Sequence, residues 1–330
     1  MKNVVDFLGA DISKKSIDLS CHSNKKHLVI ENNQFGFKAM LKWLSDNKIS
    51  SSTLLVVMEH TGLYSFCFES FLHQHKISFS KVNPLELKRS FGLARGKSDK
   101  IDAGRIASYA FEKKDKLRPE ALVSKAVQSL KLLNASRELL VRQRASLKCS
   151  VQELRHIGLP ESNLAVKSQI KVIKALDKQI HALEIEIEAV IEENESLSKN
   201  YGLLQSIIGV GKVVAYTAII KTQNFTLFAD GRKFACYCGT APFENTSGTS
   251  LRGKTKVSHI ADKRMKSLLD MAARSAINHD QEIGAFYHKR VASGKAKKST
   301  RNIVRNKIIH RMFAVIKRQT PFLPDYRIAA

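Results

Sequence analysis

The first 32 residues decide the fold class. They hold three short apolar runs separated by polar turns: NVVDFLGADI (3–12), SIDLSCHS (16–23) and KHLVIEN (26–32). Short runs of this kind, bounded by turn residues, predict β-strands. Because the connections are only a few residues long, neighbouring strands are expected to run antiparallel. The chain is therefore predicted to begin with a three-stranded meander.

The next 80 residues or so add helices and two more strands to this sheet. Apolar residues at helical spacing predict helices in FGFKAMLKWLSDN (35–47) and LYSFCFESFLHQH (63–75). The continuous apolar run STLLVVMEH (52–60) is typical of a strand buried on both faces, and ISFSKV (77–82) predicts a short strand. A helical run is predicted from Pro84 to about Lys114. The order β-β-β-α-β-α-β-α indicates a mixed sheet with helices packed on it.

Residues 121–198 change character and predict two long helices. Leucines recur every seven residues, at Leu133, Leu140, Leu147 and Leu154. The segment IGLPES (157–162) breaks the pattern, and heptad spacing returns in the second helix. Heptads do not report their partner, so the helices are expected to coil either on each other or on a second subunit.

The last third of the chain is predicted to be a mainly helical, basic domain. It opens with LLQSIIGVGKVVAYTAII (203–220), where Gly209 and Gly211 separate two apolar helical stretches. A tight turn of this kind can offer backbone N–H groups to a phosphate, although a plain helical corner is the alternative. These shifts in pattern predict three domains, at residues 1–118, 119–200 and 201–330.

Charge and cysteine usage indicate the class of partner and the compartment. Lys and Arg number 55 against 30 Asp and Glu, a formal charge of +25, and residues 252–318 hold eighteen basic residues against four acids. Such an excess favours a nucleic acid partner over a membrane surface. Without a long apolar run or an uncharged leader, the protein is expected to be soluble and cytoplasmic. The five scattered cysteines predict reduced thiols, not a zinc site.

Four carboxylates of the first domain are candidates for a metal site. Asp11 ends the first predicted strand and Glu59 ends the buried run, while Asp99 and Asp102 lie three apart on one face of a predicted helix. If that helix lies against the sheet, all four converge, and hard oxygen ligands with a phosphate substrate favour Mg²⁺, as two ions. The alternative is structural: strand-end turns at Asp11 and Glu59, and a charged helix start or local ion pairs for the aspartates.

Three motifs together resemble those of a known family. GADISKKSIDLS (9–20), VVMEHTGLYS (56–65) and GKSDKIDAGRIASYA (96–110) resemble, in order and spacing, the acidic motifs of the insertion-sequence-one-ten transposases, DEDD recombinases that include the Piv-type DNA invertases. Residues 203–220 and FACYCGTAPFENTSGTSLRGKTKVSHIADKRMKSLL (234–269) are similar to the family's second conserved domain. The resemblance covers nearly the whole chain. Two departures, Ile208-Gly209 for proline-glycine and Ala261-Asp262 for glycine-asparagine, fall outside the acids and the serine discussed next.

The resemblance implies a fold, a site and a reaction. The fold would be a RuvC-like, ribonuclease H domain with Asp11, Glu59, Asp99 and Asp102 as metal-binding acids, and Ser247 in APFENTSG (241–248) would attack DNA and form a phosphoserine link. Without the resemblance, Ser250 and Thr246 are equal competitors for Ser247. The resemblance also implies a structured guide RNA and a dimer or tetramer through the coiled coil. It further implies a bacterial or archaeal cell, with the protein associated with the nucleoid.

The leading prediction is a DNA recombinase of this chemistry, acting as a transposase on element ends and target DNA. The alternatives are a site-specific DNA invertase, a RuvC-like nuclease or junction resolvase in which water attacks, and a non-enzymatic nucleic-acid-binding coiled coil. Residues predicted to contact nucleic acid are Lys97, Lys100, Arg105, Gly209, Gly211, Arg252, Lys254, Lys256, Lys263 and Arg264.

Overall fold

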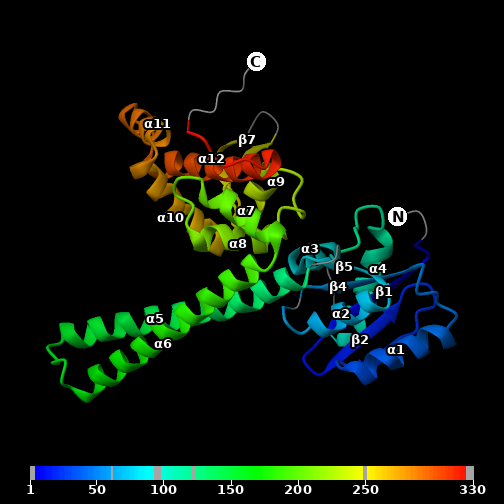
Figure 1. Ribbon diagram of the computed structural model, residues 1–330. Helices are drawn as coiled ribbons and strands as arrows, with labels where there is room; N and C mark the ends of the chain where they lie inside the picture. The colour runs from blue at the N-terminus through cyan, green and yellow to red at the C-terminus, as the bar shows by residue number, and fades with distance from the viewer. Residues whose placement is uncertain (1–3, 61, 93–97, 121–123, 248–250, 325–330) are drawn as a thin grey trace. The chain divides into compact units, whose positions relative to one another are not determined.

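The chain folds into two compact units, Met1–Leu122 and Val123–Ala330. The computed structural model describes residues 4–60, 62–92, 98–120, 124–247 and 251–324 (Figure 1). The long helices predicted for residues 121–198 belong to the second unit. No helix within the described ranges is long and apolar enough to cross a membrane.

The first unit is built on a five-stranded sheet with the order β3-β2-β1-β4-β5. β1 pairs antiparallel with β2, and β2 with β3, as the predicted meander requires. β4 pairs parallel with β1 on its other side, and β5 pairs parallel with β4. The strands span Asp6–Ile12 (β1), Ser16–Cys21 (β2), His27–Glu31 (β3), Leu54–Glu59 (β4) and Ser78–Val82 (β5).

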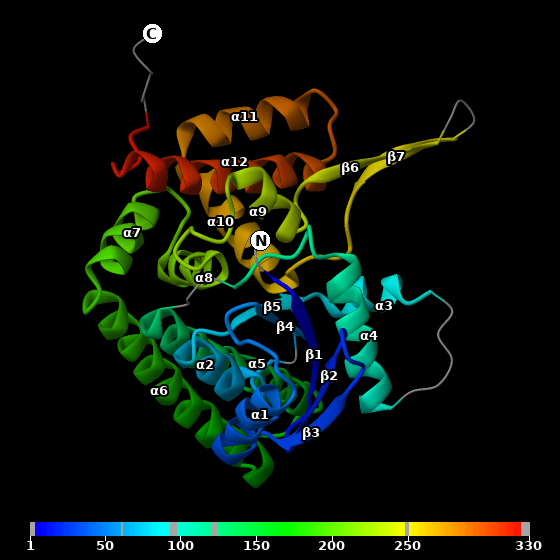
Figure 2. The ribbon, with the colours of Figure 1, turned by 90° about the vertical axis from the view of Figure 1, so that its right-hand side faces the viewer.

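Helices cover both faces of this sheet (Figure 2). α1 (Gln34–Asp46) and α2 (Phe66–Gln74) pack on the face that carries Leu8, Ala10 and Ile12 of β1. α3 (Pro84–Ser90) and α4 (Asp99–Glu112) pack on the face that carries Phe7. The strand order and the two helical layers are those of a ribonuclease H-like fold, as predicted. The single helix predicted from Pro84 to Lys114 is wrong, because α3 ends at Ser90 and Ser98 caps a new helix by accepting a hydrogen bond from the N–H of Ile101.

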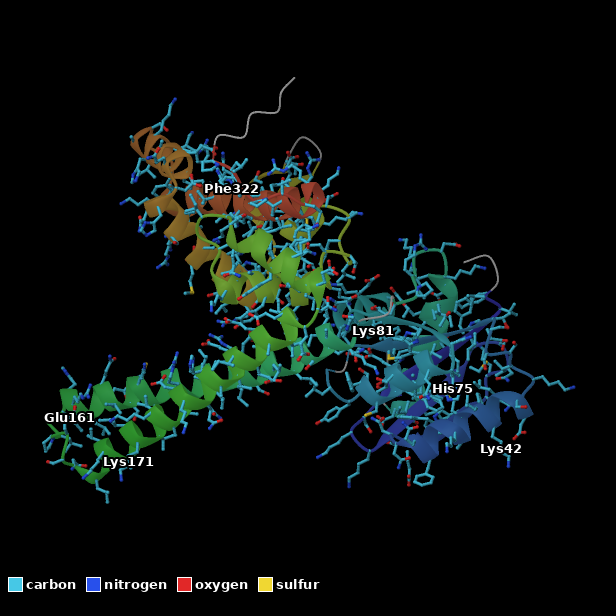
Figure 3. The ribbon with its side chains drawn as sticks, viewed as in Figure 1. Lys42, His75, Lys81, Glu161, Lys171 and Phe322 are labelled. Atoms are coloured by element: carbon cyan, nitrogen blue, oxygen red, sulfur yellow. The ribbon has the colours of Figure 1, made fainter. Side chains whose placement is uncertain are left out.

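The second unit begins with a long helical hairpin. α5 (Lys125–His156) and α6 (Leu164–Glu192) pack antiparallel along their length (Figure 1). Val151, Val166 and Ile173 form a small core towards the turn, near Glu161 in Figure 3, where Leu147 and Leu154 pack against it. The two helices therefore partner each other within one chain, and a coil between subunits stays a prediction.

The rest of the second unit is mainly helical, as predicted. A large apolar core joins its helices and includes Tyr216, Phe234 and Met312. Phe322 follows the last helix (Figure 3), with the Arg311 guanidinium 4.3 Å from its ring centroid. The helices span Glu195–Gln205 (α7), Lys212–Thr222 (α8), Gly231–Tyr237 (α9), Lys263–His279 (α10), Gln281–Ala292 (α11) and Lys297–Arg318 (α12). Between α9 and α10, β6 (Pro242–Ser247) and β7 (Leu251–Val257) pair antiparallel and extend from the helices of this unit (Figure 2).

Candidate active site

Two of the four predicted acids lie at the carboxyl ends of neighbouring parallel strands. The pairing of β1 with β4 reaches Ala10 and Met58, and Asp11 and Glu59 follow directly. Side chains alternate between the two faces of a strand. Since Ala10 and Met58 are buried on the face covered by α1 and α2, Asp11 and Glu59 point to the opposite face, where α4 packs. Carboxyl ends of parallel strands are where α/β sheets commonly place their sites.

The other two acids lie in the first turn of α4, where Asp99 and Asp102 also suit the positive end of the helix dipole. α4 is held against β1 by an unusually close approach at Gly9. A Cβ atom added to Gly9 would lie 2.2 Å from the carbonyl oxygen of Ala103 and 2.4 Å from the amide nitrogen of Ala107. Only a glycine lets helix and strand come this close. Gly9 therefore sets where Asp99 and Asp102 lie relative to Asp11.

The structure brings the four predicted acids to one cavity of about 660 Å³. In the part of the chain that the structure describes, no three acidic, histidine or cysteine side chains close on a single point as a complete metal shell would. Burial, followed by the charges of Asp99, Asp102 and Glu59, raises the pKa of Asp11 to about 6. Carboxylates that face one cavity repel each other in this way when no cation lies between them. The donor set, made of carboxylate oxygens, suits a hard divalent cation.

Basic side chains border this cavity. Arg105, one turn after Asp102, places its Nη1 3.0 Å from the Asp102 Oδ1 and also lines the cavity, together with Lys88. The ion pair predicted by the structural alternative is therefore present at Asp102, in addition to the convergence of the acids. Lys100 is exposed on α4, and Lys97 lies outside the described residues.

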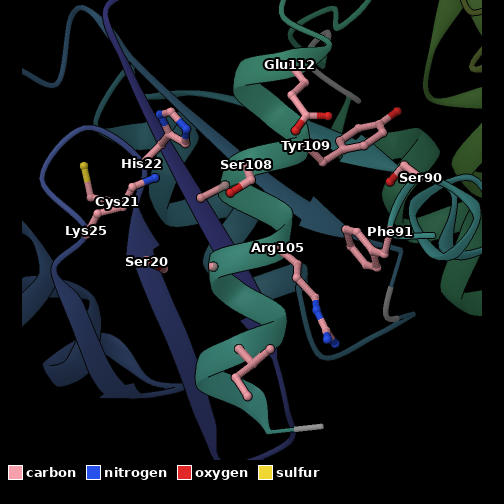
Figure 4. A pocket seen from close by; sticks show the side chains of 13 residues that line it. Ser20, Cys21, His22, Lys25, Ser90, Phe91, Arg105, Ser108, Tyr109 and Glu112 are labelled. Carbon is pink, nitrogen blue, oxygen red and sulfur yellow. The ribbon is translucent and has the colours of Figure 1, made fainter. Parts of the chain in front are cut away.

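A second cavity, of about 470 Å³, lies over α4 (Figure 4). His22 and Lys25, from the turn after β2, line it on one side of the helix, and Ser90 and Phe91 line it on the other. Arg105 lines this cavity as well as the acidic one and lies over the Phe91 ring, with 5.8 Å between the guanidinium carbon and the ring centroid. The two cavities are therefore neighbours, and the Arg105 side chain lines both of them.

Ser247 is the last residue of β6, and its backbone pairs with Leu251 of β7. Its side chain and that of Arg252 lie outside what the structure describes. Lys254 and Lys256 are exposed on β7. The β6–β7 hairpin lies between α9 and α10, and a hydrogen bond joins these two helices at its base. Asp262 caps α10 by accepting from the N–H of Met265, and it also accepts from the Tyr237 hydroxyl of α9 at 3.0 Å.

Four further residues predicted to contact nucleic acid either pack against other parts of the unit or are exposed. Gly209 has a φ of +94°, and a Cβ there would lie 2.5 Å from the Ala272 carbonyl oxygen, so close packing on α10 explains this glycine. Gly211 caps α8 with open space around it. Lys263 is exposed at the start of α10, whereas Arg264 forms an ion pair with Glu138 of α5, at 3.1 Å.

Sequence reasoning missed one acid of the cavity. Asp18 of β2 pairs directly with Asp11 of β1 and lines the same cavity. His27 of β3 donates from Nε2 to the Asp18 Oδ1 at 2.8 Å. The signal was present in SIDLS (16–20), where an aspartate alternates with the buried Ile17 and Leu19. Only the pairing with β1 shows that it faces the same cavity.

Comparison with known proteins identifies the family of the chain. Residues 8–155 match the model of the DEDD transposase of IS110 elements, and residues 201–288 match the transposase model of the IS116/IS110/IS902 family. The chain is 27% identical to the pilin gene-inverting protein of Moraxella bovis over 98% of both chains, and equally so to that of Moraxella lacunata. It is 28% identical to an uncharacterized protein of insertion element IS110 from Streptomyces coelicolor, over 42% of this chain and 33% of that protein.

Among solved structures, RuvC of T. thermophilus in complex with a Holliday junction substrate is similar to 35% of this chain, at 12% identity and with a TM-score of 0.28. The assignment of the chain to a family therefore rests on the two family models and the sequence relatives. The two models cover both the acidic cavity and the segment that holds Ser247, and the relatives span the chain from end to end. The chain therefore belongs to the IS110 family of transposases and DNA invertases, recombinases that act by phosphoryl transfer.

Proposed function

We propose that this protein cuts and rejoins DNA through Ser247, with Mg²⁺ held by Asp11, Glu59, Asp99 and Asp102. The observation that carries the proposal is the shared cavity, because acids from two strands and one helix, far apart in sequence, face the same space. A charged helix start would explain Asp99 and Asp102 but not their meeting with Asp11 and Glu59.

Two ions are proposed to occupy the cavity of about 660 Å³ that all four acids line. Two divalent cations a few ångström apart, when bound, stabilise both the attacking and the departing oxygen of a phosphoryl displacement. Asp11, with its raised pKa, has to give up its proton before it can bind a cation.

Ser247 supplies the nucleophile in the proposed reaction. Its Oγ attacks a backbone phosphorus, so that one P–O bond to the serine forms while one P–O bond of the DNA breaks. The serine proton passes to a base, and the departing oxygen of the cleaved strand takes up a proton. The ester keeps the energy of the broken bond, so a second strand end can displace the serine and rejoin the DNA without another energy source. A serine hydroxyl needs such activation because it is a weak nucleophile at neutral pH.

DNA at the element ends and target, and a structured guide RNA, are the proposed partners. The formal charge of +25 and the exposed lysines Lys254, Lys256 and Lys263 support polyanion binding. A homo-oligomer, dimer or tetramer, is proposed to form through the hairpin helices. RNA that copurifies with the protein and is protected from ribonuclease would support the guide, and activity of an RNA-free preparation would contradict it.

Site-specific inversion is the second candidate function. It is favoured by the two Moraxella relatives, which are pilin gene-inverting proteins and match the chain over 98% of its length. Inversion and transposition use the same chemistry and differ in the DNA supplied. Paired assays on a plasmid with inverted sites and on one with element ends separate the two functions by their products.

The adduct assay tests the chemistry itself. Supercoiled substrate DNA and Mg²⁺ should yield DNA that stays bound to protein in denaturant, and both Ser247→Ala and Asp102→Asn should abolish this adduct. Thr246→Ala and Ser250→Ala are matched controls. Each removes a neighbouring hydroxyl but leaves that of Ser247, so the adduct should still form. An adduct that persists in Ser247→Ala rules out this nucleophile. Cleavage that leaves only free ends would instead support the alternative in which water attacks, a RuvC-like nuclease or resolvase.

A further inference from the structure

Asp18 is a fifth carboxylate at the acidic cavity. It lies in the middle of β2, directly opposite Asp11 in the antiparallel pairing, and both line the cavity. Directly opposed residues on neighbouring strands have their Cβ atoms about 5 Å apart, and like charges at such positions destabilise the pair. Its charge also contributes to the raised pKa of Asp11. An aspartate here therefore has a cost to folding that a neutral residue would not have.

His27 holds this carboxylate in place. Its Nε2 donates to the Asp18 Oδ1 at 2.8 Å, and the side chains of Asp18 and His27 are 11% and 17% exposed, respectively. In the described part of the chain, the other oxygen, Oδ2, accepts no hydrogen bond. The His27 imidazole therefore holds one oxygen of the Asp18 carboxylate, and Asp18 lines the cavity that the four acids face.

We infer that Asp18, clamped by His27, is a positioning residue that strengthens divalent cation binding by the four acids. The inference rests on the proposed function, since it assigns a further group to the same metal centre. Mg²⁺ keeps several of its waters when proteins bind it, so a carboxylate can act on the cation without touching it. Groups that support metal ligands in this way change metal affinity about 10- to 100-fold when they are replaced.

The alternative is a purely structural pair that ties β3 to β2. A structural pair would change stability but not the affinity of the folded protein for a cation. Metal affinity measured directly, without DNA and without turnover, therefore separates the two roles. Mn²⁺ is a suitable probe, because the loss of its free-ion electron paramagnetic resonance signal reports binding to the full-length protein.

The test compares three substitutions with the wild type. Asp18→Asn should weaken Mn²⁺ binding about tenfold, and His27→Phe, which removes the donor but keeps a ring, should weaken it several-fold. Asp46→Asn is the matched control, since Asp46 is exposed on α1, the helix on the opposite face of the sheet. It should leave the affinity unchanged. Circular dichroism checks that each variant is folded, and if Asp18→Asn does not fold, His27→Phe decides.

Each outcome decides a separate claim. Wild-type affinity in both Asp18→Asn and His27→Phe overturns the inference. Weaker binding in Asp18→Asn alone retains the carboxylate but overturns the role of its clamp. Asp102→Asn tests the metal centre independently: if it also binds Mn²⁺ like the wild type, the proposed four-acid centre itself fails.

Discussion

Asp11→Asn should make the metal-free protein more stable at neutral pH. The pKa of Asp11 rises from 3.8 to about 6 through burial and the neighbouring charges of Asp99, Asp102 and Glu59. The folded protein therefore binds this proton more tightly than the unfolded chain does. Between about pH 4 and pH 6 the contribution of Asp11 to the stability falls as the pH rises, and above that window the full cost of its charge is present. Asparagine has nearly the same shape and no charge, so it avoids this cost.

The size of the effect follows from the shift. A change from 3.8 to about 6 corresponds to roughly 3 kcal/mol at about 1.4 kcal/mol per unit. Asp11 is only half-buried, and solvent screening reduces this to about 1 to 2 kcal/mol. The variant should exceed the wild type by this amount at about pH 7.5 in EDTA. The two proteins should have equal stability below about pH 3, where the carboxyl is protonated in both states.

Urea unfolding followed by tryptophan fluorescence measures this difference. The single tryptophan, Trp43, lies in α1 of the first unit, so its signal reports the unit that holds the acids. Asp115→Asn, at an exposed position after α4, is the control and should change little. Added Mg²⁺ should stabilise the wild type more than the variant, because binding stabilises the state that binds. An Asp11→Asn protein that is no more stable than the wild type at pH 7.5 in EDTA would refute the reasoning.

Two further matched pairs test the packing that positions the site and the hairpin. Gly9→Ala should destabilise the first unit by about 3 kcal/mol, because its Cβ would meet the backbone of α4. Gly104→Ala, whose Cβ would lie 3.7 Å from the Ser20 Oγ, should be neutral or stabilising by up to about 1 kcal/mol. Urea unfolding followed by Trp43 measures both, and equal stabilities would contradict the close approach. Arg137→Met should cost about 2 kcal/mol, because it removes a nearly buried guanidinium and leaves the half-buried Glu184 without the partner that lies 2.5 Å away. Arg144→Met, which breaks the more exposed pair with Asp177, should cost less than about 1 kcal/mol. Thermal unfolding followed by circular dichroism compares these two, and a larger loss for Arg144→Met would count against the reasoning.

The strands and most helices of the first unit follow from local patterns. Alternation and short turns are properties of neighbouring residues, so the meander of β1 to β3 and the buried strand β4 were predictable. The break between α3 and α4 was not predicted, although two signals lie there: Gly92 has a φ of +60°, and Ser98 caps the new helix. The helical hairpin was predicted as two long helices, but a heptad does not say which helix faces it. Only the tertiary structure shows that α5 and α6 pack on each other within one chain.

Four of the five acids at the cavity were predicted from the sequence, and the fifth was identified only in the structure. Asp11, Glu59, Asp99 and Asp102 were recognisable because each lies at the end of a strand or the start of a helix, and because their motifs resemble those of a family. Asp18 sits inside a strand, where the sequence shows only an aspartate between two apolar residues. Its pairing with Asp11 and its bond to His27 depend on strand register, which no local pattern contains.

The sequence by itself determined most element types of the first unit, the basic charge and the acids at the element ends, because these depend on residue chemistry and short-range spacing. The tertiary structure alone decided that β4 lies parallel beside β1, so that Asp11 and Glu59 leave the sheet together. It also decided how closely α4 approaches β1, through the missing side chain of Gly9. Residues far apart in the sequence converge through packing. Packing depends on contacts between distant segments, and local sequence patterns do not specify these contacts.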